Sequence, residues 1–239
     1  MIYFRSLLFF LGQAALTPLF GIVALLILPL GLPARYRVIS HWAKWVESWL
    51  RLTCGLSYRV VGAEHVPAGR PTVILAKHQS AWETIAFQKI LPPHVWVLKR
   101  ELLRIPFFGW GLAVLKPVAI DRAAGKKALR QVVDQGKARM ADGMSVMVFP
   151  EGTRMKPGQK GNYHIGGAWL AAQTGTPVLP VAHNAGEFWG KNSFLRRPGT
   201  ITVSIGPLID TAGLKADEVN RRAEAWIEAE MERIAAGAV

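Results

Sequence analysis

The chain has 239 residues, which is enough for one α/β domain with an appendage but not for a second catalytic domain. Hydrophobic residues make up 51% of the chain, and 29 Lys and Arg against 16 Asp and Glu give a formal net charge of +13. This composition excludes a globally disordered chain, and it predicts contact with lipid and attraction to an anionic partner.

An uncharged stretch from Leu7 to Ala34 is long enough to cross the core of a bilayer as a helix. Pro18 interrupts it and Pro33 closes it, so a single kinked span and a shorter re-entrant helical hairpin are both open. A cleaved signal peptide would have a shorter apolar run. We therefore expect residues 1–52 to form a membrane anchor and residues 53–239 to form the folded domain.

Cations are unevenly placed around this apolar stretch, since Arg5 precedes it whereas Arg35, Arg37 and Lys44 follow it. If the stretch crosses the bilayer once, this asymmetry places the folded domain on the cytoplasmic side, and we expect it at the cell inner membrane. A basic domain behind an apolar segment suits an anionic leaflet better than nucleic acid, because no nucleic-acid recognition motif accompanies the charge.

Three tryptophans, Trp42, Trp45 and Trp49, follow at helical spacing. Their rings combine an apolar body with a polar edge, which is typical of the membrane interface. A stripe that packs on the core of the folded domain would show the same spacing.

Beyond residue 55, apolar β-type runs alternate with helical stretches. The predicted strands are Thr72 to Ala76, Val95 to Leu98, Lys116 to Ile120, Ser145 to Phe149, Val178 to Ala182 and Thr200 to Ile205. The predicted helices are Thr84 to Ile90, Lys126 to Asp142, Gly167 to Thr174 and Ala216 to Ala236, with Gly143 and Gly175 as stop signals and a final helix that packs on the core. This alternation predicts an α/β fold with a largely parallel sheet covered by helices.

A histidine and a carboxylate, His78 and Glu83, follow the strand that ends at Ala76. Positions five apart in a regular helix point away from each other, so the two side chains meet only if His78 lies in the turn before the helix. There the carboxylate would accept the proton of one ring nitrogen and leave the other nitrogen free to act as a general base. An isolated structural hydrogen bond is the alternative for such a pair.

A second loop, Phe149 to Arg154, follows the strand that begins at Ser145. In an open α/β sheet, ligands bind at the carboxyl ends of the strands, so the two loops can share one cleft. The guanidinium of Arg154 suits a phosphate, Gly152 allows close approach of the backbone, and Glu151 can fix the arginine or bind a glycerol hydroxyl.

Further cations on the loops can gather around the same anionic head group. They are Lys99, Arg100, Arg104, Lys116 and Arg122. The chain has a single cysteine, Cys54, and no Cys and His cluster with zinc-type spacing, so we predict no metal site.

Four blocks occur in the order found in one enzyme family: His78 to Glu83, Ile120 to Arg122, Phe149 to Arg154, and Val178 to Val181. In these blocks, across roughly residues 60 to 210, the chain resembles the glycerolipid acyltransferases, a family that includes the 1-acylglycerol-3-phosphate acyltransferases. The resemblance implies that His78 is the general base and that Glu83 orients it. It also implies that Arg122 and Arg154 hold the phosphate of the acceptor, with further substrate contacts from Lys99, Glu151 and Gly152.

Two positions depart from the pattern of that family. Glu83 stands where the family usually has an aspartate, and Tyr163 to Gly166 stands where a Phe-Lys-Lys-Gly stretch is expected. The second departure leaves the choice of acceptor open, with His164 as a possible replacement for a cation of the acceptor site.

The resemblance implies transfer of a fatty acyl group from acyl carrier protein or coenzyme A to the sn-2 hydroxyl of lysophosphatidic acid, giving phosphatidic acid. A thioester is already activated, so we expect no metal and no organic cofactor. Acyl transfer to another lyso-lipid, such as a lyso-ornithine lipid, and a non-catalytic basic protein that binds membranes are the alternatives. A hydrolase is disfavoured, because the chain has no Gly-x-Ser-x-Gly nucleophile motif.

Overall fold

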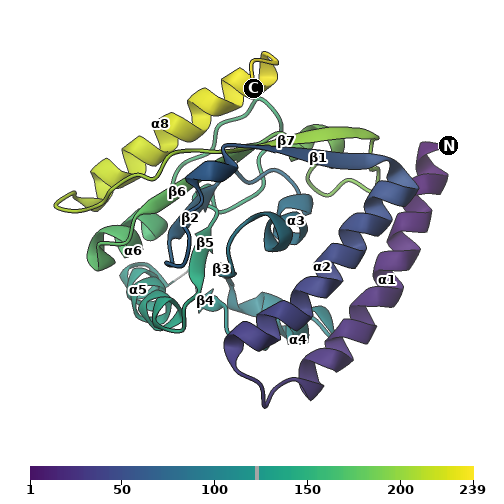
Figure 1. Cartoon of the computed structure of the whole chain (residues 1–239), viewed down its shortest axis with the longest axis horizontal. Helices are drawn as coiled ribbons and strands as arrows, with labels where there is room; N and C mark the ends of the chain where they lie inside the picture. Colours follow the sequence, from purple (N-terminus) through teal and green to yellow (C-terminus); the bar gives the residue numbers. More distant parts are fainter. Residues whose placement is uncertain (122–123) are drawn as a thin grey trace.

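The computed structural model of the chain describes residues 1–121 and 124–239, which form a seven-stranded sheet with helices on both faces (Figure 1). The strands lie in the spatial order β1-β7-β6-β2-β5-β3-β4, and every neighbouring pair is parallel except β6 and β7. Their bounds are Leu56–Val61 (β1), Val73–Ala76 (β2), His94–Lys99 (β3), Val118–Ile120 (β4), Ser145–Val148 (β5), Val178–His183 (β6) and Gly199–Ile205 (β7). The predicted fold class is confirmed.

The centre of the sheet consists of β2, β5 and β6, in which every residue is buried. Ile74 of β2 lies level with Met147 of β5 on one side and Leu179 of β6 on the other. A strand covered on both faces reads as a continuous apolar run, which is why these strands could be predicted from the sequence. Because β2, β5 and β3 are adjacent and parallel, the loops after them emerge at the same edge of the sheet.

One strand that the sequence pattern does not predict is β1, which lies at the edge of the sheet and pairs in parallel with β7. Its sequence, Leu-Ser-Tyr-Arg-Val-Val, mixes buried and exposed positions and includes Arg59. An edge strand that is covered on one side only lacks the apolar run that marks the central strands.

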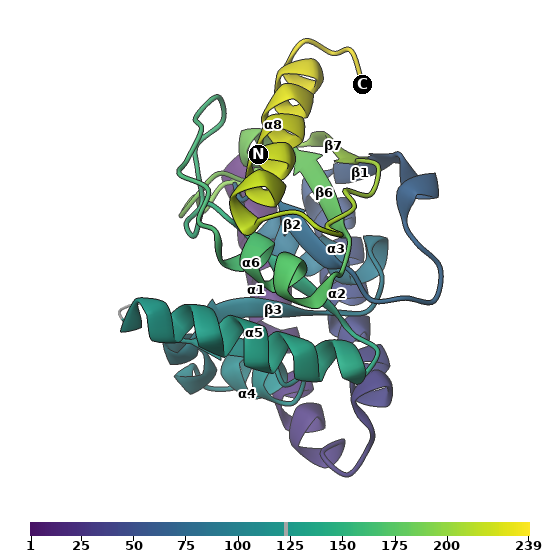
Figure 2. The same ribbon diagram turned by 90° about the vertical axis from the view of Figure 1, so that its left-hand side faces the viewer.

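Figures 1 and 2 show α5, α6 and α8 on one face of the sheet, and the N-terminal helices α1 (Ile2–Leu26) and α2 (Leu32–Cys54) with α3 and α4 toward the other. The helices after the hairpin are Trp82–Ile90 (α3), Phe108–Ala113 (α4), Lys126–Ala141 (α5), Gly166–Thr174 (α6), Ala185–Phe188 (α7) and Ala216–Ala235 (α8), with short 3-10 helices η1 at Ala63–His65 and η2 at Arg100–Arg104. The final helix packs on β6 through a stripe of buried residues that includes Val219, Ala223 and Ile227, as its amphipathic pattern predicts.

The N-terminal segment is a helical hairpin of α1 (Ile2–Leu26) and α2 (Leu32–Cys54), which lie side by side (Figure 1). The uncharged stretch is therefore not one helix, because the chain turns at residues 27–31. Within the described residues, α1 is the one helix that is long and apolar enough to cross a membrane, and 17% of its apolar window is buried in the protein. The predicted domain boundary after residue 52 falls inside α2.

The three tryptophans of α2 have different surroundings. Trp42 is buried in the core, and Trp49 donates from Nε1 to the carbonyl oxygen of Leu8 in α1 at 3.0 Å. Trp45 is 55% exposed and lies edge-on to Phe20. Core packing thus explains Trp42 and Trp49, whereas Trp45 presents its ring to the surroundings.

Candidate active site

The turn after β2 positions His78 before α3, as the spacing to Glu83 predicts. His78 Nδ1 and Glu83 Oε1 are 2.8 Å apart, and the same oxygen accepts hydrogen bonds from the backbone nitrogens of Gln79 and Ser80 at 2.9 and 2.8 Å. An ionised carboxylate only accepts, so Nδ1 donates its proton and Nε2 keeps its lone pair. The turn therefore holds the imidazole in the tautomer that a general base needs.

Glu83 is fully buried, and its charge state follows from its neighbours. Burial favours the neutral carboxyl, but the imidazoles of His183 and His78 and the Ser80 amide outweigh burial and lower the pKa of Glu83. The carboxylate is thus ionised at neutral pH and can stabilise a positive charge that forms on His78 during proton transfer.

The imidazole of His78 stacks on the ring of Phe149, with ring centres 4.1 Å apart and an interplanar angle of 14°. Phe149 begins the loop after β5, so this contact joins the two predicted loops directly. The side chain of His78 is 14% exposed, which keeps the ring accessible from the cleft beside it.

This cleft has a volume of about 520 Å³, and its lining includes His78, Lys99, Gly152 and Arg154. The backbone of Gly152 turns with φ 66°, in the left-handed region that favours glycine. The Nε of Arg154 is buried and has no hydrogen-bond partner within the described residues. Histidine, arginine and lysine therefore face one space that can take an anionic substrate.

Lys191 also lines the cleft, although no sequence pattern pointed to it. Its Nζ donates to the hydroxyl of Thr153 at 3.1 Å, directly beside Arg154. It lies in the segment between α7 and β7, far along the chain from both loops. Lys191 comes close to the two loops through the fold of the sheet and not through its position in the sequence.

Apolar space continues from the cleft toward the hairpin. A small cavity of about 40 Å³ shares Trp42, Trp96, Phe108 and Leu112 with the cleft and is also lined by Phe20 of α1. His164, in contrast, does not line the cleft but an adjoining pocket of about 300 Å³, which shares Val97, Phe149 and Gly152 with the cleft.

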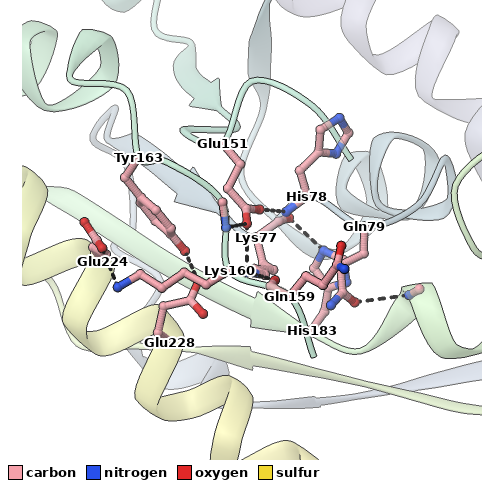
Figure 3. Close-up of polar contacts among 12 residues, drawn as sticks. Lys77, His78, Gln79, Glu151, Gln159, Lys160, Tyr163, His183, Glu224 and Glu228 are labelled. Carbon is pink, nitrogen blue, oxygen red and sulfur yellow. Dashed lines mark hydrogen bonds and ion pairs between the residues drawn. The ribbon is translucent and has the colours of Figure 1, made fainter. Parts of the chain in front are cut away.

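Glu151 does not line the cleft, and its side chain points toward Lys77 and the backbone nitrogen of His78 (Figure 3). Its side chain is fully buried, with Oε2 accepting from the backbone nitrogen of His78 at 2.9 Å and Oε1 accepting from Lys77 Nζ at 2.8 Å. Arg122, the remaining predicted site residue, lies outside the described residues. Among residues 1–121 and 124–239, no group of three His, Cys, Asp or Glu side chains is placed to hold a metal ion.

The comparison with known proteins agrees with the resemblance in the loops. The acyltransferase family matches residues 57–184. A 1-acyl-sn-glycerol-3-phosphate acyltransferase of Pseudomonas aeruginosa is 45% identical over 96% of this chain and 91% of its own, and one of Borreliella burgdorferi is 31% identical over 72% and 68%.

The fold is also that of a solved relative. The crystal structure of the 1-acyl-sn-glycerophosphate (LPA) acyltransferase PlsC from Thermotoga maritima superposes with a TM-score of 0.82 at 24% identity, over 98% of this chain and 96% of that one. The likeness shows a shared fold, and the sequence matches show that the chain belongs to the acyltransferase family that includes the 1-acyl-sn-glycerol-3-phosphate acyltransferases.

Proposed function

We propose that the chain transfers a fatty acyl group from a thioester of acyl carrier protein or coenzyme A to the sn-2 hydroxyl of lysophosphatidic acid, giving phosphatidic acid. The observation that carries the proposal is that His78, with Nε2 free, and Arg154 line one cleft. The 45% identity to a relative of that name supports the choice of acceptor.

In the proposed reaction, His78 Nε2 takes the proton of the acceptor hydroxyl as its oxygen attacks the thioester carbonyl carbon. The carbon–sulfur bond then breaks, and the imidazolium gives its proton to the leaving sulfur, which departs as the thiol of the carrier. Glu83 stabilises the positive ring between these two proton transfers. No acyl-enzyme forms, and because the thioester is already activated, the reaction needs no metal and no organic cofactor.

The remaining site residues fit substrate binding. Arg154 and Lys99 hold the phosphate of the acceptor, and Arg122 stays a predicted partner of the same phosphate. The apolar space between the cleft and the hairpin suits a fatty acyl chain. Glu151 is too deeply buried for a direct substrate contact in this arrangement, and Gly152 contributes a backbone turn at the wall of the cleft.

The hairpin supports attachment to an anionic membrane, which we propose to be the cell inner membrane with the catalytic domain on its cytoplasmic side. Many large apolar side chains of α1 face away from the protein, among them Phe4, Leu11, Ile22 and Leu26. This face would let the enzyme meet a lyso-lipid without removing it from the bilayer.

The test is to supply the purified protein with an acyl thioester and an equimolar mixture of lysophosphatidic acid, a lyso-ornithine lipid and lysophosphatidylcholine, and to identify the products by mass spectrometry. We expect phosphatidic acid as the main product, because Arg154 and Lys99 select a bare phosphate. His164, which would favour a different head group, lies outside the cleft. A main product made from another lyso-lipid, or thioester hydrolysis without any acceptor, would contradict the proposal.

A further inference from the structure

Lys77, the residue before His78, is a buried cation that never reaches the cleft. It is 1% exposed, and its ammonium group lies 2.8 Å from Glu151 Oε1, 2.8 Å from Glu228 Oε1 and 3.2 Å from the carbonyl oxygen of Gln159. All three donors of the ammonium group are therefore used inside the protein. No step of the proposed reaction uses this charge, so we look for its role in the groups that Lys77 binds.

Lys77 and Glu151 together hold the backbone of His78. Glu151 accepts from Lys77 on one oxygen and from the His78 amide on the other, while the carbonyl oxygen of His78 accepts from the Met155 amide at 2.7 Å. In Figure 3 the imidazole of His78 points away from this cluster, while its backbone nitrogen faces Glu151. The cluster thus fixes the peptide that carries the imidazole.

The second carboxylate of the cluster comes from α8, about 150 residues away along the chain. Glu228 Oε1 accepts from Lys77 and also from the hydroxyl of Tyr163 at 2.7 Å. The carbonyl oxygen of Tyr163 in turn accepts from Asn220 of the same helix at 3.0 Å. The last helix therefore extends the cluster to the surface, where the side chain of Glu228 is 20% exposed.

We infer that Glu228 is a positioning residue for the His78 base, acting from α8 through Lys77 and Glu151. Two carboxylates, the buried Glu151 and the partly exposed Glu228, hold the ammonium group between the turn after β2 and α8. Without Glu228, the ammonium group can move toward solvent, which weakens its ion pair with Glu151. The hydrogen bond from the His78 amide to Glu151 then weakens as well, because both contacts share one carboxylate. The inference rests on the proposed function, because it assumes that His78 is the base.

The test compares Glu228→Leu, which removes both hydrogen bonds, with Glu228→Gln, whose amide oxygen can still accept from Lys77 and Tyr163. We expect Glu228→Leu to lower kcat by about tenfold or more, because small misplacements of a catalytic group are costly, with both KM values within about twofold of the wild type. Hydrogen exchange at the amides of residues 77–80 should become faster. Glu228→Gln should restore kcat to within about threefold of the wild type.

Glu224→Leu is the matched control. It breaks an ion pair of the same helix, to the exposed Lys160 at 2.6 Å, and this pair does not include Lys77 (Figure 3). We expect unchanged kcat and unchanged exchange at residues 77–80 in this variant.

Three results would overturn the inference: Glu228→Leu with wild-type kcat and exchange, a change in KM alone, or the same losses in Glu224→Leu. If Glu228→Leu does not fold, Glu228→Ala removes the same carboxylate with a smaller side chain and should still speed exchange at residues 77–80 and lower kcat. Wild-type exchange and kcat in that variant would also overturn it. The exchange measurement needs no substrate, so its outcome is separate from success or failure of the proposed acyl transfer.

Discussion

A single carboxylate oxygen of Glu83 organises the turn that carries the base. It accepts from the ring of His78 and from two consecutive backbone nitrogens, those of Gln79 and Ser80. Glutamate is one methylene longer than the aspartate usual in the family, and its placement in the first turn of α3 lets the longer side chain reach back to the histidine. The departure noted in the sequence therefore preserves the contact.

At Arg154, the structure predicts a specific effect on acceptor binding. Arg154→Gln removes a charged donor from the cleft, and hydrogen bonds to charged groups are worth about 1.5–3 kcal/mol, so the KM for lysophosphatidic acid should rise roughly tenfold to a hundredfold. The KM for the acyl thioester should change little. Steady-state kinetics with each substrate varied in turn measures both values.

Lys156→Gln is the control for that substitution, because Lys156 is an exposed cation two residues further on that does not line the cleft. Equal effects of the two substitutions on the acceptor KM would show that only general surface charge matters at this loop.

The sequence predicts the positions of some site residues but not of others. His78, Glu83 and Arg154 follow apolar strands, and the rule for carboxyl ends of parallel strands was sufficient to bring them together. The family resemblance implies a substrate contact for Glu151, whereas in the structure its side chain is buried and accepts a hydrogen bond from Lys77. Lys77, Lys191 and Glu228 were missed, since their contacts join segments whose proximity depends on the complete sheet and on α8.

Among the elements, β1 depends on the glycine that ends it. Gly62 has φ 77°, and a Cβ placed on it would lie 2.0 Å from the carbonyl oxygen of Ile205 at the end of β7. The chain thus needs glycine there for two reasons, the left-handed backbone and the close approach of a neighbouring strand.

Gly62→Ala should therefore lower the free energy of unfolding more than Gly69→Ala. Gly69 has φ 72° but open space around its Cβ position, so alanine there carries only the cost of the left-handed conformation, about 1–2 kcal/mol. The clash at Gly62 should add about 1–3 kcal/mol, as overpacking does. Urea unfolding of both variants measures the difference, and equal losses would show that β7 gives way to the added methyl group.

The fold class could be predicted because three central strands are continuous apolar runs. The helical hairpin and the strand at the edge of the sheet could not be predicted. The stretch from residue 7 to residue 34 contains no charge that would mark the turn at residues 27–31, so one kinked span and a hairpin looked alike. The antiparallel pairing of β6 and β7 left no pattern in either strand.

Across the whole molecule, α1 contributes to the cleft through Gln13 and to the small cavity beside it through Phe20, while its other face carries exposed apolar side chains. Leu11→Glu and Ile22→Glu place charges on exposed positions of α1. Each should weaken binding to anionic vesicles by tenfold or more, because a charge at the centre of a bilayer costs about 2.5–3.5 kcal/mol. Vesicle sedimentation measures this affinity.

Trp169→Glu provides the comparison, because Trp169 of α6 is a similarly exposed large apolar residue outside the hairpin. We expect wild-type vesicle binding for this variant. Wild-type binding of the two α1 variants would contradict a membrane role for the hairpin.

The most direct measurement is the rate of phosphatidic acid formation from lysophosphatidic acid and an acyl thioester by the wild type and by His78→Ala, with the fold of the variant checked by circular dichroism. If His78 is the base, its loss should lower the rate by about 10²-fold or more. A folded His78→Ala protein that forms phosphatidic acid at the wild-type rate would contradict the account.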